Sequence, residues 1–189
     1  STDAAGNRGP VASRSWTVDT VAPTNSPSIT SGPATPGNDN TPTFAVGGSG
    51  TGETYVCAID AGAFGVCTSP FTTSALADGS HTFKVALVDA AGNQGPATTT
   101  TFVVDTTPPA ATPTISTQPS DPSNNPAPAI AFTGAGAGET YQCQLASGAW
   151  SACTSPTGIG PLADGSVTFG VRLVDTAGML GGGHGDVDG

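Results

Sequence analysis

The sequence predicts an all-β protein made of tandem β-sandwiches with about seven strands per module. Three observations carry this prediction: a repeat of 86 residues, short segments in which apolar and polar residues alternate, and clusters of turn residues between these segments. The chain has 27 glycines and 17 prolines among its 189 residues, and no stretch shows the apolar periodicity of a helix. Short alternating strands separated by Gly, Pro, Asn and Asp are typical of a sandwich.

The repeat runs through the chain without gaps. The motifs GETY, CTSP and LADGS each occur twice at this spacing, starting at Gly52, Cys67 and Leu76 and again at Gly138, Cys153 and Leu162. A D-x-A-G motif occurs three times, starting at Asp3, Asp89 and Asp175. A fixed period of domain size indicates repeated modules.

The period also predicts the domain boundaries. We expect the end of a first repeat with its last two strands at residues 1–21, a complete repeat at 22–107, a third repeat without its last strand at 108–178, and a divergent Gly-rich acidic tail at 179–189. Because the chain starts at Ser1 without an apolar leader, we expect an internal fragment of a longer protein. No apolar run is long enough to predict a transmembrane helix.

The alternation locates the strands. In HTFKVALVD, at residues 81–89, Phe83, Val85 and Leu87 share one face, and the copy at residues 167–175 keeps this pattern. The other strands of the complete repeat are expected near Ile29, Phe44, Cys57, Phe64, Thr72 and Val103. The first fragment supplies Trp16 and Val18 at the place of the last strand, whereas the third repeat has no counterpart of TTTTFVVDT.

The segment TPTF…GETYVCAID…LADGSHTFKVALVDAAGNQGPATTTTFVVDTTPP resembles the bacterial Ig-like repeats of large secreted and cell-surface proteins. Its LADGSHTFKV part is also similar to a turn of fibronectin type III modules. The resemblance covers nearly the whole chain. It implies an Ig-like or fibronectin III-like sandwich used in tandem arrays as a stalk or adhesion module, and it does not identify a ligand.

The composition excludes some partners. The formal net charge is −10, from 14 acidic and 4 basic residues. Nucleic-acid binders and proteins that dock to anionic membrane surfaces need clusters of Lys and Arg, so we expect neither partner nor direct membrane insertion. The acidity fits solubility, and it fits cation binding where carboxylates converge.

The four cysteines form one pair per module, and the two members of each pair are ten positions apart. This pattern favours the disulfides Cys57–Cys67 and Cys143–Cys153, which imply an oxidising, extracytoplasmic setting. Reduced thiols and a zinc site are the alternatives. Zinc is disfavoured because C-x9-C lacks the usual ligand spacing and because Val167 replaces His81 in the next repeat.

Acidic and amide oxygens recur at the two joints, and they suggest calcium as the only cofactor. The first candidate site comprises Asp19, Glu53, Asp89 and Asn93, and the second comprises Asp105, Glu139 and Asp175. The second site is weaker because Met179 stands at the position of Asn93. The alternative is that these residues only build turns at the strand ends.

No pattern predicts catalysis. His81 is not repeated, and His184 lies in the divergent tail. The GGSGTG segment at residues 47–52 lacks the second glycine of a nucleophile elbow and the lysine of a phosphate loop, so it is interpreted as a flexible loop. The tail ends in GDVDG, where Asp186 and Asp188 would begin a calcium-binding loop or simply form a disordered acidic end.

We therefore expect a non-enzymatic spacer or adhesion repeat of a bacterial surface or secreted protein that projects a functional domain. Its partners would be the neighbouring repeats of the same chain and a cell-surface or carbohydrate ligand. The alternative is an accessory binding module or a linker of a secreted hydrolase. An exposed aromatic platform would favour this alternative, and Trp150 and Tyr141 are its candidates.

Overall fold

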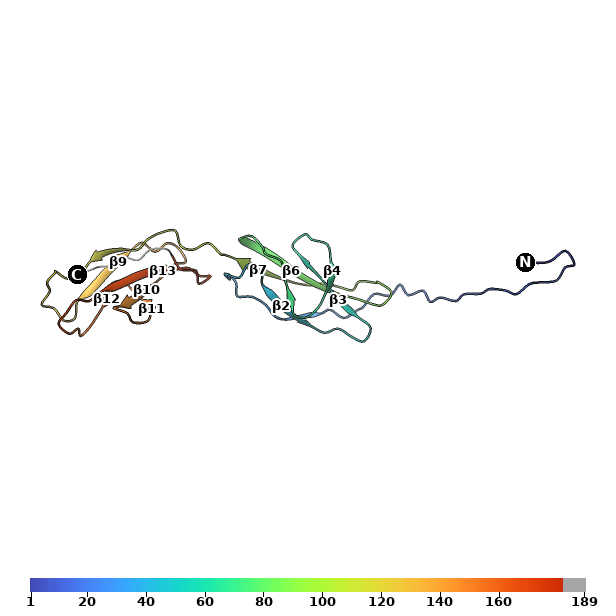
Figure 1. The fold of residues 1–189 in the computed structure, drawn as a ribbon, viewed down its shortest axis with the longest axis horizontal. Helices are drawn as coiled ribbons and strands as arrows, with labels where there is room; N and C mark the ends of the chain where they lie inside the picture. Colours follow the sequence, from blue (N-terminus) through green and yellow to red (C-terminus); the bar gives the residue numbers. More distant parts are fainter. Residues whose placement is uncertain (182–189) are drawn as a thin grey trace.

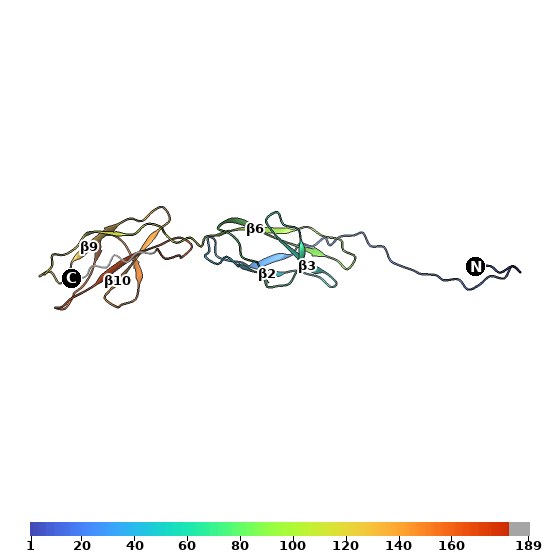
Figure 2. The same ribbon diagram turned by 45° about the horizontal axis from the view of Figure 1, so that its top comes forward.

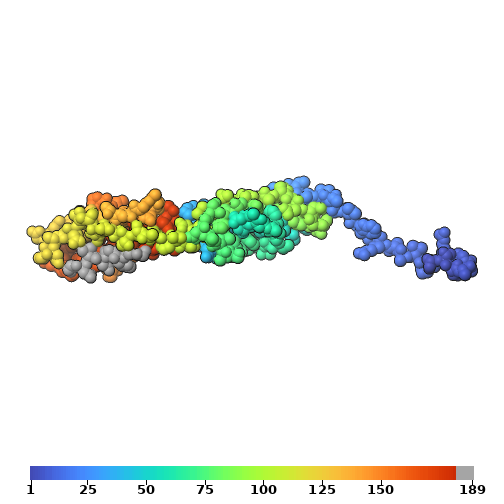
Figure 3. Space-filling view, turned by 90° about the horizontal axis from the view of Figure 1, so that it is seen from above, coloured from blue at the N-terminus to red at the C-terminus, as the bar shows by residue number. Residues whose placement is uncertain are grey.

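The computed structural model describes residues 1–181. These residues form thirteen β-strands and no helix, and the strands build two sandwiches that follow one another along the molecule (Figure 1). The predicted all-β fold is therefore confirmed. The N-terminal residues extend away from the first sandwich, as the turned ribbon and the space-filling view also show (Figures 2 and 3).

The first sandwich contains seven strands, as predicted. They are β1 (Ser28–Ser31), β2 (Thr43–Gly47), β3 (Thr54–Ile59), β4 (Gly65–Cys67), β5 (Phe71–Thr72), β6 (Gly79–Val88) and β7 (Thr98–Val104). One sheet has the order β1-β2-β5, and the other has the order β4-β3-β6-β7. Adjacent strands in both sheets are antiparallel. Each strand lies within a residue of a position predicted from the sequence.

The core of the first sandwich lies between these two sheets. Phe44 of β2 stacks on Phe83 of β6 with ring centroids 4.1 Å apart, and it meets Phe102 of β7 edge-on at 5.2 Å. All three rings are almost fully buried, together with Val85 and Val104. Rings at these distances add contact energy to the burial of apolar surface, so the predicted alternating face is the packing face.

The second sandwich repeats this arrangement with six strands. They are β8 (Thr114–Thr117), β9 (Ala129–Thr133), β10 (Thr140–Leu145), β11 (Ser151–Cys153), β12 (Thr157–Gly158) and β13 (Phe169–Val174). The sheets have the orders β12-β9-β8 and β11-β10-β13. Ile130, Phe132, Phe169 and Val171 form a separate buried cluster. Each repeat thus has its own core.

The last strand of the second sandwich is shorter than its counterpart. β6 has ten residues and pairs with both β3 and β7, whereas β13 has six residues and pairs with β10. Within the described residues no strand occupies the place of β7 beside β13. Residues 165–168 precede β13 and are not part of it. Their counterparts in β6 pair with the C-terminal half of β7. A strand without its neighbour loses its ladder bonds there.

The N-terminal segment departs from the prediction that it forms two strands. Trp16 and Val18 were expected in a last strand, but they lie in no strand and are 76% and 74% exposed. Only the turn at Asp3–Asn7 and an isolated bridge between Thr2 and Arg8 are ordered as in the other repeats. The reason is physical: a strand needs a partner for its backbone groups, and this segment has none among the described residues.

Among residues 1–181 no helix is long and apolar enough to cross a membrane. The predicted loop start at Asp186 and Asp188, and His184, lie outside the described residues.

Candidate functional site

The joint after the first sandwich begins where β7 ends. The backbone N–H of Asp105 donates to Gly37 O at 2.9 Å, and Gly37 N–H donates to Val103 O at 3.0 Å. Gly37 and Val104 also form a parallel bridge. The chain is therefore held against the sandwich by the loop between β1 and β2 as it enters the linker.

Asp78 fixes the next two residues of the linker. Its Oδ1 accepts hydrogen bonds from Thr106 N at 2.9 Å and from Thr106 Oγ1 at 2.7 Å, and its Oδ2 accepts one from Thr107 Oγ1 at 2.5 Å. These bonds lower the pKa of Asp78. The hydrogen bond from the Thr107 hydroxyl has the largest effect, and those from Thr106 follow. Asp78 lies in the turn before β6, so this turn and the linker are tied together. No pattern in the sequence marks Asp78 for this role.

The joint before the first sandwich is held by contacts with the loop between β6 and β7. The Nδ2 group of Asn93 donates to Asp19 O at 3.1 Å. At Gly95, a Cβ atom would lie 2.5 Å from Pro23 O, which leaves no room for any side chain. The linker backbone therefore packs directly on this glycine.

The joint between the two sandwiches repeats the contact between a glycine and a linker proline. Gly181 occupies the position of Gly95, and a Cβ atom there would lie 3.2 Å from Pro109 Cβ. Pro109 in turn occupies the position of Pro23. In both repeats a linker proline thus packs on a glycine. This glycine lies in the loop after β6 in the first repeat and after β13 in the second. The repeated proline restricts the linker backbone and supplies this contact.

The D-x-A-G motif forms the same turn three times. Asp89 Oδ1 accepts hydrogen bonds from Ala91 N and Asn93 N, each at 2.9 Å, and its Oδ2 accepts one from Asn93 Nδ2 at 2.9 Å. Asp3 makes the matching bonds to Ala5 and Asn7. The side-chain bond from the asparagine is the largest cause that lowers the pKa of Asp89 and of Asp3. The motif therefore builds a turn by itself, even in the N-terminal segment that lacks strands.

The other carboxylates proposed for calcium also bond within their own loops. Asp19 Oδ1 accepts from Val21 N at 3.1 Å, and Asp105 Oδ1 accepts from Thr107 N at 3.2 Å. Glu53 Oε2 accepts from Gly50 N at 2.6 Å and from Asn25 Nδ2 at 3.2 Å. The remaining two bond likewise, Glu139 to Gly136 and Asp175 to Ala177 and Met179.

Of the seven predicted ligands, the structure brings three together, because Asn93 Nδ2 donates both to the Asp19 carbonyl and to Asp89 Oδ2. Within residues 1–181 no three His, Cys, Asp or Glu side chains gather closely enough to hold a metal ion. Calcium binding therefore stays a prediction. It requires that these side chains come closer together than they lie in the structure.

Both predicted disulfides are present. Cys57 joins Cys67, and Cys143 joins Cys153, with Cα atoms 5.8 Å apart in each pair. Cys57 lies opposite Gly65, and Cys67 lies opposite Tyr55, so the bond crosses diagonally between β3 and β4. The described residues include no free cysteine. The bond staples a strand of three residues to the sheet.

His81 has a structural partner in the first sandwich. Its Nδ1 lies 2.8 Å from Asp60 Oδ2, and its Nε2 lies 2.9 Å from Ala77 O. Two acceptors facing one ring favour its doubly protonated form, so they raise the pKa of His81. The hydrogen bond with Asp60 has a larger effect than the one with Ala77. The same pair lowers the pKa of Asp60. At the matching positions the second sandwich has Ala146 and Val167, so the pair is not repeated.

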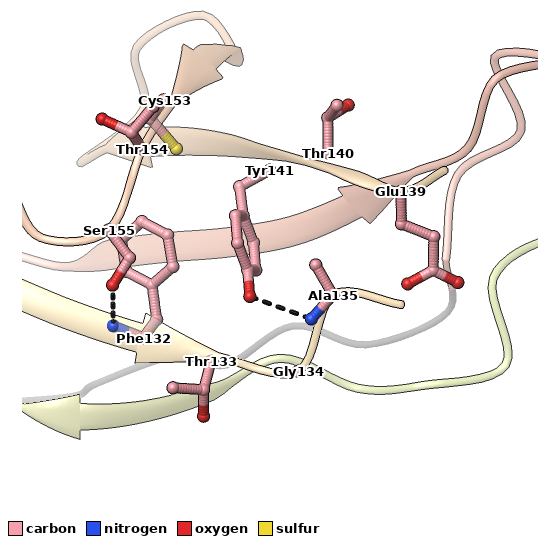
Figure 4. Close-up of a pocket in the computed structure, with 10 residues that line it drawn as sticks. All are labelled: Phe132, Thr133, Gly134, Ala135, Glu139, Thr140, Tyr141, Cys153, Thr154 and Ser155. Atoms are coloured by element: carbon pink, nitrogen blue, oxygen red, sulfur yellow. Dashed lines mark hydrogen bonds between the residues drawn. The ribbon is translucent and has the colours of Figure 1, made fainter. Parts of the chain in front are cut away.

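A hollow of about 620 Å³ opens beside β9 and β10 (Figure 4). Its polar side chains bond to nearby backbone: Tyr141 OH accepts from Ala135 N at 2.9 Å, and Ser155 Oγ accepts from Phe132 N at 2.8 Å. Tyr55 and Ser69 make the matching bonds in the first sandwich. Because these bonds are repeated in both sandwiches, they indicate that the tyrosines and serines have a structural role in the fold.

Trp150 does not form an open aromatic platform. The Arg172 guanidinium lies over its ring, 4.3 Å from the centroid, and Gln142 Oε1 accepts hydrogen bonds from Arg172 Nε at 3.0 Å and Nη2 at 2.7 Å. The ring also packs on β13, where a Cβ atom at Gly170 would lie 3.0 Å from it. Trp150 therefore covers the outer face of its own sheet.

Comparison with known proteins identifies the type of module. Residues 32–106 match the bacterial Ig-like domain. The resemblance stated from the sequence is thereby confirmed for these residues, and the strand order of the first sandwich agrees with it. A search of curated protein sequences finds no significant match.

Solved structures give the same fold. The fibronectin(III)-like modules of Clostridium thermocellum CbhA share 14% identity, with a TM-score of 0.58, over 85% of this chain and 91% of that chain. At this identity the likeness concerns the fold alone. Dimeric latent PorU from Porphyromonas gingivalis matches with 15% identity and a TM-score of 0.28, over 85% of this chain and 20% of that chain.

Proposed function

We propose that this chain is a non-enzymatic spacer of a bacterial surface or secreted protein, in which consecutive Ig-like modules project a functional domain. The observation that carries the proposal is the anchored joint. Asp78 holds Thr106 and Thr107 on one side, and Pro109 packs on Gly181 on the other. A spacer works by length and restricted bending, and both require that the linker is fixed to the modules it connects.

The location follows from the same features. One disulfide in each module would persist outside the cytoplasm and would be reduced within it, which supports an extracellular or cell-surface place. Bacterial Ig-like and fibronectin III-like domains are generally non-catalytic, which supports a mechanical role. Trp150, the residue that would favour an accessory binding module, has its ring covered by Arg172.

The experiment that tests the proposal is Asp78→Ala measured by small-angle X-ray scattering. The variant removes the acceptor of three hydrogen bonds from the linker, so we expect a wider range of angles between the two sandwiches and a smaller radius of gyration. Asp164→Ala is the matched control, because Asp164 occupies the same position in the second sandwich and has no linker threonines at its side among the described residues.

The radius of gyration of the control should equal that of the wild type. If Asp78→Ala also scatters like the wild type, the joint is not held by Asp78, and the spacer proposal loses its supporting observation.

A further inference from the structure

His81 lies at the end of the first sandwich from which the linker leaves. It belongs to β6 and follows Gly79 by two residues, and Gly79 pairs with Val104 at the end of β7. Its side chain is 13% exposed, and its ring centroid lies 5.7 Å from that of Phe102. The imidazole is therefore part of the pole of the sandwich that carries the joint.

The ring connects two turns that approach it from different sides. Asp60, in the turn after β3, is fixed to β6, because its N–H donates to Thr82 O at 2.8 Å and its Oδ1 accepts from Thr82 N at 2.7 Å. Ala77, in the turn before β6, places its carbonyl oxygen 2.9 Å from Nε2 of the ring. Asp60 is thus held independently of His81, whereas Ala77 O has the ring as its partner.

The turn around Ala77 has few other attachments. Leu76, which packs on the core, and Gly79, the first residue of β6, anchor it on either side. Among the hydrogen bonds of residues 1–181, two sets hold the turn between these anchors: the contact of Ala77 O with the His81 ring, and the bonds of Asp78 with the linker threonines. A displacement of Ala77 therefore moves the residue that holds the linker.

The protonation state of His81 decides whether both of its contacts are hydrogen bonds. The imidazolium carries a proton on each nitrogen and donates to Asp60 and to Ala77 O. The neutral ring carries one proton, and the Asp60 carboxylate retains it because bonds to a charged acceptor are stronger. The lone pair of Nε2 then faces the lone pairs of Ala77 O, and the carbonyl is repelled.

The charged groups near the ring set the pH range of this change. The hydrogen bond from Asp60 is the largest cause that raises the pKa of His81 above 6.5, so the ring becomes neutral above that pH. Lys84, further along β6, acts on Asp60 and lowers its pKa. β7 has no titratable side chain. Asp78 in the turn and Asp105 at the start of the linker accept hydrogen bonds from linker threonines.

We propose that His81 is a pH-sensitive switch of the joint, which strengthens the hold of Asp78 on the linker when its ring is protonated and weakens it when the ring is neutral. The inference rests on the proposed spacer function and adds a regulation of it: the joint is stiffer at mildly acidic pH and bends more freely as the pH rises. The second sandwich lacks this switch, since Val167 stands at the position of His81.

The coupling must act in both directions, which gives a test by NMR. If protonation of His81 strengthens the hold on the linker, the held linker raises the proton affinity of His81. In a His184→Gln background His81 is the only histidine, so its ring protons report its pKa. Thr106→Val with Thr107→Val removes two hydrogen bonds to Asp78 and leaves every charged group in place, so the pKa of His81 should fall. An unchanged or higher pKa would overturn the proposal.

Small-angle X-ray scattering below and above the pKa of His81 measures the joint itself. The radius of gyration of the wild type should be larger below this pKa than above it. It should not change with pH in His81→Val, which copies Val167, nor in Asp78→Ala, whose linker is already released. A wild type that does not respond to pH would contradict the switch, and so would an equal response in His81→Val.

Failure of the switch and failure of the spacer function give different results. If Asp78→Ala is more compact than the wild type below the pKa of His81, the linker is held and the spacer proposal stands. A wild type without a pH response then overturns only the role of His81. If Asp78→Ala equals the wild type at every pH, both proposals fall.

Discussion

Thr73 shows how a single position differs between two repeats of one fold. Its side chain is 6% exposed, and its Oγ1 atom is buried without a hydrogen-bond partner among the described residues. The matching residue of the second sandwich is Ile159, which packs on the core cluster there. A buried hydroxyl without a partner costs free energy, and an apolar residue of the same shape does not.

We therefore predict that Thr73→Val raises the free energy of unfolding of the first sandwich by about 1 kcal/mol. Chemical denaturation of the wild type and the variant measures the difference. Thr72→Val is the control, because Thr72 Oγ1 lies 2.8 Å from Thr43 Oγ1 on the exposed face and the change removes that bond. The control should be neutral or slightly destabilised. A loss of stability in Thr73→Val would mean that its hydroxyl has a partner after all.

His81 gives the first sandwich a pH dependence that the second sandwich lacks. The pKa of His81 is raised in the folded state, so folding stabilises its protonated form. This stability is fully present below the unfolded pKa of about 6.5, and it is lost as the pH rises through the folded pKa. The pKa of Asp60 is lowered, so its contribution is lost as the pH falls through the folded pKa, below about 3.8.

The measurement is the free energy of unfolding as a function of pH. We expect the wild-type first sandwich to lose stability as the pH rises above about 6.5. His81→Val, which copies Val167, should remove this loss. The second sandwich is the internal control and should unfold with no such change over the same range. A pH dependence that persists in His81→Val would assign it to another group.

At the scale of the element, the alternation in the sequence was sufficient to locate β6 and β13, but it could not give their lengths. HTFKVALVD and VTFGVRLVD have the same pattern, yet β6 has ten residues and β13 has six. The difference comes from the neighbouring strand β7, which pairs with residues 79–85 of β6. The same cause explains why Trp16 and Val18 carry a strand sequence but form no strand.

This difference predicts the hydrogen exchange of the two strands. His81 and Phe83 pair with Phe102 and Thr100 of β7, so their amides should be protected. Val167 and Phe169 face the edge where β7 would lie, and among residues 1–181 no strand covers this edge, so their amides should exchange faster. Exchange followed by NMR gives the comparison residue by residue. Equal protection of the two pairs in dilute protein would show that the edge of β13 is already covered.

At the scale of the whole molecule, the joints are where sequence reasoning was least complete. The repeat period placed Asp19 and Asp105 at the expected joints, and in the structure Asp105 directly follows β7. Sequence reasoning could not find that Asp78 holds Thr106 and Thr107, or that Gly95 touches Pro23. These contacts join segments far apart in the chain, and neither charge nor periodicity marks them.

Gly95→Ala tests the first joint. A methyl group there would lie 2.5 Å from Pro23 O, so the linker must move away from the loop. We expect the hydrogen bond from Asn93 Nδ2 to Asp19 O to break, which the NMR shift of the Asn93 side-chain amide reports. Gly65→Ala is the matched control, because a Cβ atom there meets nothing within 4 Å. An unchanged Asn93 signal in Gly95→Ala would mean that the linker does not rest on this loop.

The diagonal disulfide has a consequence for a module under tension. If the modules act as a spacer, pulling force runs between the two ends of each sandwich and can unravel it. The bond joins residues ten positions apart, so the loop between Cys57 and Cys67 stays closed when the rest of the module extends. Ten residues span at most about 35 Å when extended, so each unravelled module yields about 30 Å less chain than its length implies. The cystine therefore limits how far the array lengthens before the next module takes up the load.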